Sequence, residues 1–392
     1  MAMKILHTVE SYFPDIGGMP EVVKQLSERL VSLGHEVTVA TRISEKRTSN
    51  IINGVVIKDF NISGNQVEGI KGDAHAYELF LKSSNFDIIT NFAAQQWATD
   101  LALPILPHLK AKKVFVPTGF SGLYQHAYKN YYELMKSRMK SYDRNIFLSN
   151  DYRDINFARQ NGISKNTVIP NGAAANEFLA PAQTDIRKQL GIGEDQFFIL
   201  HVGSYTGVKG HAEAIRIYLK STIKNGVLVF VGSGHEHFLK YVSSYWRFFL
   251  WKLFHLFPKK KYIITQLSRE ETVAAYKAAD LFLFPSKIEC SPIVLFEAMA
   301  SKTAFLSTDV GNAKEIVEWS HGGEILPTFI DQEGFSCADI NGSAKQLDNL
   351  YRQSEKRKLL AQQGFTSWQE KFSWEVISKR YETLYLELLK EK

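Results

Sequence analysis

Three consecutive segments near the start of the chain decide the fold class: KILHTV (4–9), EVVKQLSERLVSLG (21–34) and HEVTVAT (35–41). The first and third are short apolar runs of the kind that form buried strands. In the middle segment apolar residues recur at helical spacing, and Gly34 supplies the left-handed position at which helices end. These apolar residues are Val22, Val23, Leu26, Leu30 and Leu33. The pattern predicts a strand, a crossover helix and a second, parallel strand.

Further strand candidates continue this series up to a Pro170-Asn171-Gly172 turn. They are FDIITNF (86–92), KKVFVPT (112–118), RNIFLSN (144–150) and NTVIPNG (166–172). We therefore expect a first domain over residues 1–173.

A second series of strands and helices starts after this boundary. Its members are FFILHVGS (197–204), a helix over 211–221, GVLVFVGSG (226–234), KKYIITQ (260–266), REETVAAYKAA (269–279), DLFLFPS (280–286), PIVLFEAMAS (292–301) and TAFLSTD (303–309). Alternating strands and helices predict a second parallel-sheet α/β domain, over 174–370. The amphipathic stretch 371–392 predicts a helix that packs back toward the first domain.

Composition indicates a globular protein rather than a membrane-spanning or disulfide-stabilised one. Of the 392 residues 45% are hydrophobic and 22% charged, and no uncharged apolar run is long enough to span a bilayer. The opening residues lack the pattern of a secretion signal, and the two cysteines, Cys290 and Cys337, imply no disulfide framework. We expect a cytoplasmic protein, either free or peripheral at the inner face of the cell membrane. The net charge of +6 suits anionic ligands, but no nucleic-acid recognition module accompanies it.

The most informative segment is PSKIECSPIVLFEAMA (285–300). Ser291 followed by Pro292 is typical of a helix start, with Ser at the N-cap and Pro at the first helical position. The backbone N–H groups of Ile293, Val294 and Leu295 would then point out of the helix end. Unpaired N–H donors at the positive end of a helix dipole form a diphosphate site.

Two carboxylates flank this predicted helix start. Glu297 would lie about 9 Å from Ser291 along the helix axis, within reach of two ribose hydroxyls. Glu289, on the preceding loop, would approach the sugar end of a ligand. The alternative is that Glu289 is a solvated loop charge and Glu297 a surface helix residue.

This segment resembles the Glu-x7-Glu signature of glycosyltransferase family 4, whose members are retaining enzymes of the GT-B fold. Further motifs follow in the family's order along nearly the whole chain. They are the Gly-Gly loop and first helix within 4–41, VIPNGAAANEF (168–178), LHVGSYTGVKG (200–210), VGSGHE (231–236), LSREETVAAYKAADLFLFPS (267–286) and TDVGNAKEI (308–316). The resemblance implies two Rossmann-like domains that face each other across a cleft, with the C-terminal helix bracing them. The second domain would bind a nucleotide-sugar and the first most of the acceptor.

The resemblance assigns roles residue by residue. Lys209 matches the family's basic residue on the leaving diphosphate, and Glu289 the carboxylate near the donor sugar; these two are the predicted catalytic residues. The predicted donor-binding residues are Gly17, Gly18, Gly203, Ser204, Lys209, Glu289, Ser291, Pro292, Ile293, Val294 and Glu297. The predicted acceptor-side residues are Gly119, Phe120 and Asn171. An ordinary strand-to-helix turn at Gly17 and a solvated charge at Lys209 remain the alternatives.

The chain departs from the family pattern at two positions. Ser204 stands where the family commonly has an arginine, so one cation is lost. Thr118, Gly119 and Phe120 stand where a histidine near the reacting sugar is common. Both changes leave the diphosphate less neutralised unless Arg42, Lys129 or the backbone of the Gly119 loop compensates. They suggest either a distinct subfamily or a weakened enzyme.

The mechanism implied by the family is retention of anomeric configuration without a protein nucleophile. The leaving diphosphate would itself take the acceptor's proton, and the protein would supply positioning and electrostatics. The chain contains no metal-binding Asp-x-Asp motif of the other common glycosyltransferase architecture. We therefore expect no cofactor and no essential metal.

An aromatic and basic segment, 238–261, is the sharpest change in composition, and it ends in Lys259, Lys260 and Lys261. One hypothesis is an interfacial helix that meets an anionic membrane and brings a lipid-linked acceptor within reach. The other is a donor-domain helix whose aromatic residues pack in the core or against a second copy of the chain.

The predicted function is hexosyl or related transfer from a nucleoside-diphosphate-sugar to a glycan or lipid-linked acceptor, in glycan, surface polysaccharide or glycolipid biosynthesis. A nucleotide-sugar epimerase or phosphorylase on the same architecture is one alternative, and a catalytically weak sugar-nucleotide-binding protein is another. Hydride transfer is disfavoured because no Gly-x-Gly-x-x-Gly follows the first strand.

Overall fold

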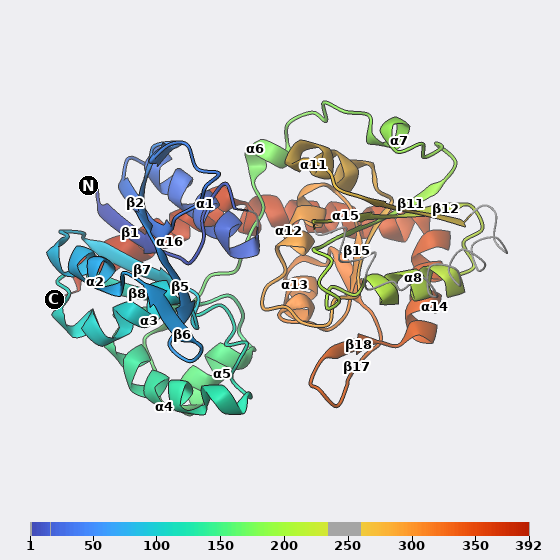
Figure 1. Ribbon diagram of the computed structural model, residues 1–392. Coiled ribbons are helices and arrows are strands. Elements are labelled where there is room, and N and C mark those ends of the chain that lie inside the picture. Colours follow the sequence, from blue (N-terminus) through green and yellow to red (C-terminus); the bar gives the residue numbers. More distant parts are fainter. Residues whose placement is uncertain (1, 16, 234–259, 392) are drawn as a thin grey trace. The chain divides into compact units, whose positions relative to one another are not determined.

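The structure is a computed structural model that describes residues 2–15, 17–233 and 260–391. The chain forms two compact units, Met1–Asn171 with Trp374–Lys392 and Gly172–Ser373 (Figure 1). The domain boundaries predicted from the sequence follow residues 173 and 370, whereas the chain passes between units at Asn171/Gly172 and at Ser373/Trp374. The last helix therefore belongs to the first unit.

The first unit is built on an eight-stranded sheet with the order β10-β9-β8-β7-β1-β2-β4-β3. Its strands are β1 (Lys4–Thr8), β2 (Glu36–Arg42), β3 (Ile51–Ile52), β4 (Val55–Phe60), β7 (Ile88–Phe92), β8 (Lys112–Val116), β9 (Arg144–Phe147) and β10 (Asn166–Val168). All neighbours are parallel except β3 and β4. A short antiparallel pair, β5 (Ile62–Asn65) and β6 (Gly69–Gly72), stands apart from this sheet.

The helices of the first unit complete the predicted crossovers. They are α1 (Gly18–Ser32), α2 (Ala74–Ser83), α3 (Trp97–Ala102), α4 (Lys129–Arg138), α5 (Arg153–Gln160) and α16 (Trp374–Lys390), with the 3-10 turns η1 (Leu103–His108), η2 (His126–Tyr128) and η3 (Met139–Ser141). Helix α1 buries Val22, Val23, Leu26 and Leu30 as predicted, but Leu33 is its exposed C-cap. The left-handed Gly34 follows, with a φ of 92°.

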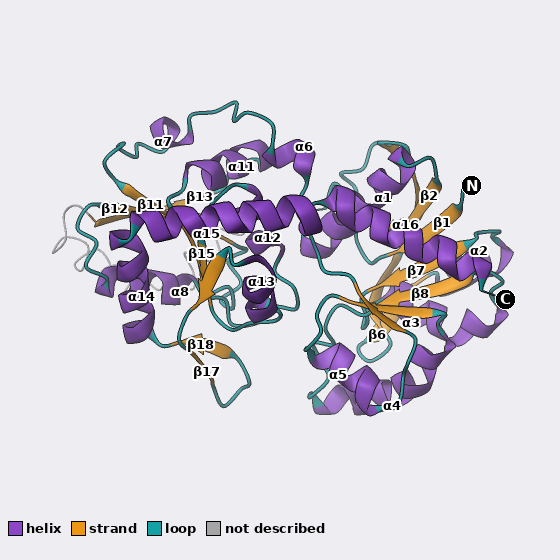
Figure 2. Cartoon of the chain, turned by 180° about the vertical axis from the view of Figure 1, so that it is seen from behind, coloured by secondary structure: helices purple, strands orange, loops and turns teal. Residues whose placement is uncertain are grey.

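Helix α16 is held on the first unit by polar contacts as well as by its apolar face. Arg29 on α1 forms an ion pair of 2.7 Å with Glu375. His35 contacts Glu382 at 2.9 Å, and the Tyr385 hydroxyl lies 2.7 Å from Thr90 Oγ1 on β7. Figure 2 shows α16 running beside α1. The sequence from 374 onward therefore completes the first unit.

The second unit contains a six-stranded parallel sheet with the order β13-β12-β11-β14-β15-β16. Its strands are β11 (Phe197–Val202), β12 (Gly226–Val231), β13 (Lys260–Thr265), β14 (Leu281–Phe284), β15 (Phe305–Ser307) and β16 (Gly323–Ile325), and an antiparallel pair is formed by β17 (Thr328–Ile330) and β18 (Ser336–Ala338). The helices are α6 (Ala175–Phe178), α7 (Ile186–Gln189), α8 (His211–Lys220), α11 (Arg269–Ala278), α12 (Ile293–Ala300), α13 (Ala313–Ser320), α14 (Ile340–Arg352) and α15 (Ser354–Ser367), followed by a π-turn η4 (Trp368–Phe372).

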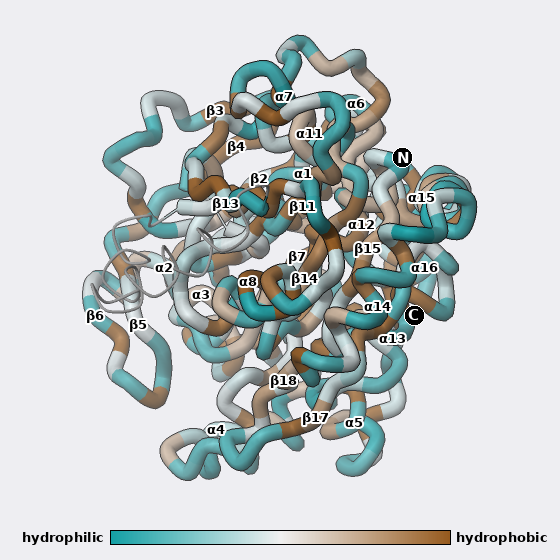
Figure 3. The backbone as a smooth tube through the Cα atoms, turned by 90° about the vertical axis from the view of Figure 1, so that its right-hand side faces the viewer, coloured by the Kyte–Doolittle hydropathy of each residue, from teal (hydrophilic) through white to brown (hydrophobic). Residues whose placement is uncertain are grey.

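The central strands of each sheet are largely buried on both faces, as parallel strands covered by helices are. Every residue of β12 and β14 is buried. Hydrophobic colours gather along such strands in Figure 3, whereas hydrophilic colours mark outer helices and turns. Among the described residues no helix is both long and apolar enough to cross a membrane. The predicted class, two α/β units with parallel sheets, is confirmed.

Candidate functional site

The strand order of the second unit reverses between β11 and β14. From β11 the chain moves outward to β12 and β13, and from β14 it moves the other way to β15 and β16. Loops after the two central strands diverge at such a switch point, and parallel α/β sheets bind ligands in the crevice that this creates. Residues 203–210 follow β11 and residues 285–292 follow β14. These two loops carry most of the predicted donor-binding residues.

A glycine lets the two loops approach each other closely. Gly210 has a φ of 77°, and a Cβ atom there would lie 1.9 Å from the carbonyl oxygen of Pro285. The N–H of Lys287 donates to the carbonyl of Val208 at 2.8 Å. Only glycine, which has no side chain, allows the two loops to come this close. The close approach fixes the backbone position of the neighbouring Lys209.

The two predicted catalytic residues meet at this switch point. Lys209 Nζ lies 2.6 Å from Glu289 Oε1, and Ser286 Oγ donates to the same oxygen at 2.9 Å. The side chains are 27% and 13% exposed, so the pair is partly screened from water but reachable. Glu289 is therefore not a solvated loop charge, and Lys209 is not a free cation. A diphosphate bound here would share the ammonium with Glu289.

Helix α12 begins one residue later than the sequence predicts. Pro292 is its N-cap, with φ −70° and ψ 107°, and Ile293 is the first helical residue. The prediction of Ser291 as N-cap is wrong because the ψ of Pro292 is extended rather than helical. The N–H of Leu295 donates to the Pro292 carbonyl at 3.1 Å, so Leu295 is not available to a ligand. Ile293 and Val294 are half-buried at the helix start, while Ser291 and Pro292 are buried.

The turn after β15 supports the loop that precedes α12. The N–H of Asn312 donates to the Cys290 carbonyl at 2.9 Å, and a Cβ atom on Gly311 would lie 2.4 Å from that carbonyl oxygen. The TDVGNAKEI motif of the sequence thus holds the backbone beside Glu289.

The second carboxylate, Glu297, is buried and paired. Its side chain is 6% exposed, and Oε1 accepts from Arg269 Nη1 at 2.6 Å. Arg269 also donates through Nε to Glu177 at 3.0 Å. Burial rules out the surface-helix alternative for Glu297. One carboxylate oxygen is thereby fixed in place.

Arg269 and Glu177 also belong to the surroundings of Glu297, and neither was predicted from the sequence. The available signal was the Ser268–Glu271 capping box, in which Ser268 Oγ accepts from the Glu271 N–H at 3.2 Å. This cap sets the first turn of α11 and so the direction of Arg269. Its pairing with Glu297, 28 residues away, depends on how α11 lies against α12.

Gly203 and Ser204 begin the loop that ends at Lys209. A Cβ atom on Gly203 would lie 3.3 Å from Lys209 Cβ, so the glycine leaves room for the lysine stem. Lys209 is the only cation in residues 203–210. His201 beneath the loop is fully buried, and its Nδ1–H donates to the Leu283 carbonyl at 2.8 Å. Burial holds the pKa of His201 well below the usual range. A neutral imidazole cannot replace the charge missing at Ser204.

The first unit has its own switch point, between β1 and β7. Gly17 is the exposed N-cap of α1 and Gly18 its first residue, with the Glu21 N–H donating to the Gly17 carbonyl at 3.1 Å. These glycines start the crossover helix that follows β1. They lie in the first unit, and the remaining predicted donor residues lie in the second.

The predicted acceptor-side loop has an unusual backbone. Thr118, Gly119 and Phe120 have φ values of 60°, 105° and 52°. Such residues persist only where surrounding contacts hold them, often beside ligands. Asp154 Oδ2 accepts from the Gly119 N–H at 2.9 Å, and burial raises the pKa of Asp154 to about 6.

Phe120 does not offer its side chain to an acceptor. It is buried and makes edge contacts with Tyr132 and Phe157, with ring centroids 5.0 and 5.4 Å apart. Asn171, the last residue of this part of the unit, is also buried. All three predicted acceptor-side residues are buried: Gly119 lies in the loop after β8, and Phe120 contributes to the core.

Most of the predicted aromatic and basic segment, residues 238–259, lies outside the described residues. Lys260 is described and is buried. Its Nζ donates to the carbonyls of Tyr218 and Ser221 at 2.8 and 2.7 Å, at the end of α8. This lysine therefore caps a helix and does not offer its charge to anionic head groups.

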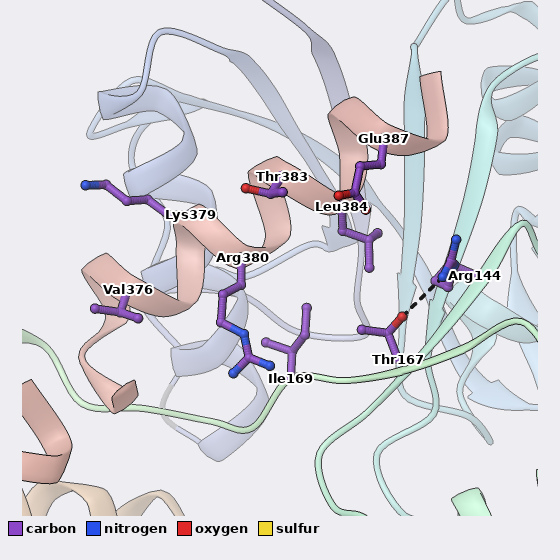
Figure 4. Close-up of a pocket in the computed structure, with 9 residues that line it drawn as sticks. All are labelled: Arg144, Thr167, Ile169, Val376, Lys379, Arg380, Thr383, Leu384 and Glu387. Atoms are coloured by element: carbon purple, nitrogen blue, oxygen red, sulfur yellow. Dashed lines mark hydrogen bonds between the residues drawn. The ribbon is translucent and has the colours of Figure 1, made fainter. Parts of the chain in front are cut away.

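A cavity of about 430 Å³ lies along the edge strand β10 and helix α16 (Figure 4). Its lining residues are Arg144, Thr167, Ile169, Val376, Lys379, Arg380, Thr383, Leu384 and Glu387. None of the predicted site residues is among them. The cavity is separate from the carboxyl ends of β1 and β7.

Two family models match the chain in succession. The model described as Glycosyltransferase Family 4 matches residues 16–177, and the one described as Glycosyl transferases group 1 matches residues 182–364. The chain is a group 1 glycosyltransferase of family 4. The family's two matched regions correspond to the first and second units of this glycosyltransferase.

Curated relatives of this family 4 glycosyltransferase include N-acetyl-alpha-D-glucosaminyl L-malate synthase of Bacillus anthracis, 27% identical over 53% of the chain and 50% of the relative. Lipopolysaccharide 1,2-N-acetylglucosaminetransferase of Salmonella typhimurium is 25% identical over 55% of each protein. The chain thus spans about half the length of these relatives. Alpha-monoglucosyldiacylglycerol synthase of Acholeplasma laidlawii is 23% identical over 97% of the chain and 96% of the relative.

Solved structures share the fold at low identity. Sucrose-phosphate synthase from Thermosynechococcus elongatus is similar with a TM-score of 0.79 at 18% identity, covering 99% of both chains. Anabaena Alr3699/HepE in complex with UDP gives a TM-score of 0.72 at 18% identity, covering 97% of this chain and 99% of that one. This glycosyltransferase therefore has the GT-B fold class predicted from its sequence.

Proposed function

We propose that the protein transfers a sugar from a nucleoside-diphosphate-sugar to a hydroxyl acceptor with retention of anomeric configuration. One observation carries this proposal: Lys209 and Glu289 meet 2.6 Å apart beside the start of α12, at the switch point of the second sheet. A cation and a helix N-terminus suit a diphosphate, and a neighbouring carboxylate suits sugar hydroxyls. Three relatives are named for transfer of N-acetylglucosamine or synthesis of a glucosylated lipid, which supports a hexosyl donor.

Each site residue has a role in this proposal. Lys209 and the N–H groups of Ile293 and Val294 bind the diphosphate, while Glu297, held on one oxygen by Arg269, receives the ribose hydroxyls. Glu289 orients the donor sugar. These groups accelerate the reaction to the extent that they stabilise the charge that develops in the transition state as the glycosidic bond breaks.

The proposed reaction needs no protein nucleophile. The bond between the anomeric carbon and the diphosphate oxygen breaks, the acceptor oxygen bonds to the same carbon from the same face, and the acceptor proton goes to the departing diphosphate. Lys209 stabilises the negative charge that grows on that leaving group. We also propose that no metal ion is required, and turnover that falls after EDTA treatment and recovers with Mg²⁺ would contradict this.

The donor is identified by a screen in two steps. Thermal shift across a panel of UDP-, ADP- and GDP-sugars finds ligands of the folded protein, because a ligand that binds only the folded state raises its melting temperature. Labelled donors that score are then incubated with sugar and glycolipid acceptors, and the anomeric configuration of the product is read by NMR. UDP and UDP-glucose come first in the panel, since both are bound in the solved structures of Anabaena HepE.

For the acceptor, we propose a glycan or lipid-linked molecule presented at a membrane. Two relatives are named for lipid-linked products: alpha-monoglucosyldiacylglycerol synthase and the GPI3 subunit of phosphatidylinositol N-acetylglucosaminyltransferase of Saccharomyces cerevisiae. Flotation of the full chain with vesicles of phosphatidylglycerol and phosphatidylcholine tests membrane binding. Recovery only at the bottom of the gradient would refute this part of the proposal.

A weakly catalytic sugar-nucleotide-binding protein is the second candidate. It is favoured by Ser204, which removes a cation, and by the neutral His201 beneath it. A protein that binds a donor but yields no transfer and no hydrolysis with any acceptor would fit this candidate. An epimerase would instead return a nucleotide-sugar of altered stereochemistry, visible in the same NMR assay.

A further inference from the structure

Glu10 stands at the switch point of the first sheet. It follows β1 by two residues, and β1 lies between β7 and β2 in the sheet order. Ligands of parallel α/β sheets bind beyond the carboxyl ends of the strands at this place. No motif of the sequence drew attention to this residue.

The backbone of Glu10 is fixed on both sides. Its N–H donates to Gln96 Oε1 at 2.6 Å, and its carbonyl accepts from the Arg42 N–H at 3.1 Å and from Thr41 Oγ1 at 3.3 Å. The Gln96 amide in turn donates to the Ala93 carbonyl at 3.2 Å. Glu10 thus joins the ends of β2 and β7 where the regular strand pairing stops.

The carboxylate of Glu10 is not used by these contacts. The side chain is half-buried, and among the described residues no hydrogen bond or ion pair to its oxygens is formed. Arg42, the cation whose charge acts on Glu10, is paired with Asp15 at 3.3 Å. Burial raises the pKa of Glu10, and Arg42 opposes this shift. The oxygens of this half-buried carboxylate are thus available to accept hydrogen bonds from a ligand in place of water.

We propose that Glu10 is a specificity-determining residue that accepts hydrogen bonds from the hydroxyl groups of an uncharged polyol acceptor. This inference rests on the proposed transfer reaction. A carboxylate accepts from two neighbouring hydroxyls, as sugars present them, and repels a phosphate or carboxylate at the same position. The acceptor group that enters the first unit is therefore a neutral sugar or similar polyol.

The test uses the full-length protein, the donor found by the screen, and methyl hexosides with their 6-phosphate counterparts as acceptors. Glu10→Gln keeps the size of the side chain but removes the charge. We expect its KM for the neutral acceptor to rise about 10- to 100-fold, the range for a hydrogen bond to a charged group. Its preference for the neutral over the phosphorylated acceptor should fall at least about tenfold, while the KM of the donor stays within about twofold.

Glu36→Gln is the matched control, because Glu36 is an exposed residue at the opposite end of the same sheet, on the first position of β2. It makes the same charge change and should alter neither acceptor constant. An unchanged acceptor preference in Glu10→Gln overturns the inference, as does a wild-type protein that favours the phosphorylated acceptors. A parallel rise in the KM of donor and acceptor also overturns it, because it indicates a structural role.

The proposed function can fail separately. If wild type transfers to no acceptor, saturation-transfer NMR of methyl hexosides with wild type and Glu10→Gln still decides the role of Glu10. Binding that is lost in the variant supports the inference, and equal binding or none refutes it.

Discussion

Replacing Lys209 by alanine tests the central contact of the site. The change leaves Glu289 with Ser286 as a partner, in a carboxylate that is 13% exposed. Exposed ion pairs contribute about 0–1 kcal/mol, and breaking a buried pair costs about 3–5 kcal/mol. For this partly buried pair we expect unfolding free energy to fall by about 1–3 kcal/mol. A unit of this size should then melt about 3–10 °C lower.

Ligand affinity should change by more than stability does. A hydrogen bond between charged groups contributes about 1.5–3 kcal/mol, so Lys209→Ala should raise the Kd of UDP, or of the diphosphate that the screen selects, about 10- to 100-fold. Glu289→Gln should not weaken diphosphate binding, because it removes an anion that competes for the ammonium. It should reduce the preference for the intact nucleotide-sugar over the diphosphate. Isothermal titration at a temperature well below both melting points measures these constants.

The double variant Lys209→Ala/Glu289→Ala distinguishes two roles of Lys209, neutralisation of Glu289 and contact with the diphosphate. If Lys209 only neutralises Glu289, removal of both residues restores the diphosphate affinity of the wild type. If Lys209 contacts the diphosphate, the double variant binds as weakly as Lys209→Ala while its melting temperature partly recovers. Restored affinity would therefore refute our assignment of Lys209.

Three further predictions concern the supporting residues. Arg269→Met leaves the buried Glu297 carboxylate without its cation, so we expect a loss of about 1–3 kcal/mol in urea unfolding and a donor KM raised about tenfold; an unchanged donor KM would contradict the role of Glu297. Asp154 has a pKa of about 6 against a usual 3.8, so it stabilises the fold below pH 4 and loses this effect as pH rises through 6. The unfolding free energy of wild type relative to Asp154→Asn should fall by about 2–3 kcal/mol between pH 4 and 6.5, and a flat difference would refute this. Gly210→Ala places a Cβ atom against the Pro285 carbonyl at a positive φ, so the unfolding free energy from thermal melting should fall by about 2–4 kcal/mol. Gly191→Ala is the control, because Gly191 also has a positive φ but open space around it, and its unfolding free energy should fall by only about 1 kcal/mol.

Much of the fold follows from local sequence. The strands and helices predicted from apolar periodicity and turn residues occur in both units, because a buried parallel strand is largely apolar on both faces and a crossover helix on one. Strands β3 to β6 and helices α2 to α5 were not predicted. Helix α1 shows both the success and the limit of predicting burial from apolar periodicity. Four of its five predicted apolar residues are buried, and the fifth, Leu33, is exposed because the helix ends there. The predicted start of α12 was wrong by one residue. The ψ of Pro292 depends on contacts of the preceding loop rather than on the Ser-Pro pair.

The sequence by itself determined the two α/β units, the family and the residue types of the proposed diphosphate site, because these are carried by short segments in a fixed order. Only the tertiary structure decided which side chains pair. Lys209 and Glu289 are 80 residues apart, and Arg269 and Glu297 are on different helices. The position of Glu10 at a switch point likewise depends on strand order. Such pairings arise from how strands and helices are arranged in space, and no periodicity along the chain encodes a distance between loops that follow non-consecutive strands.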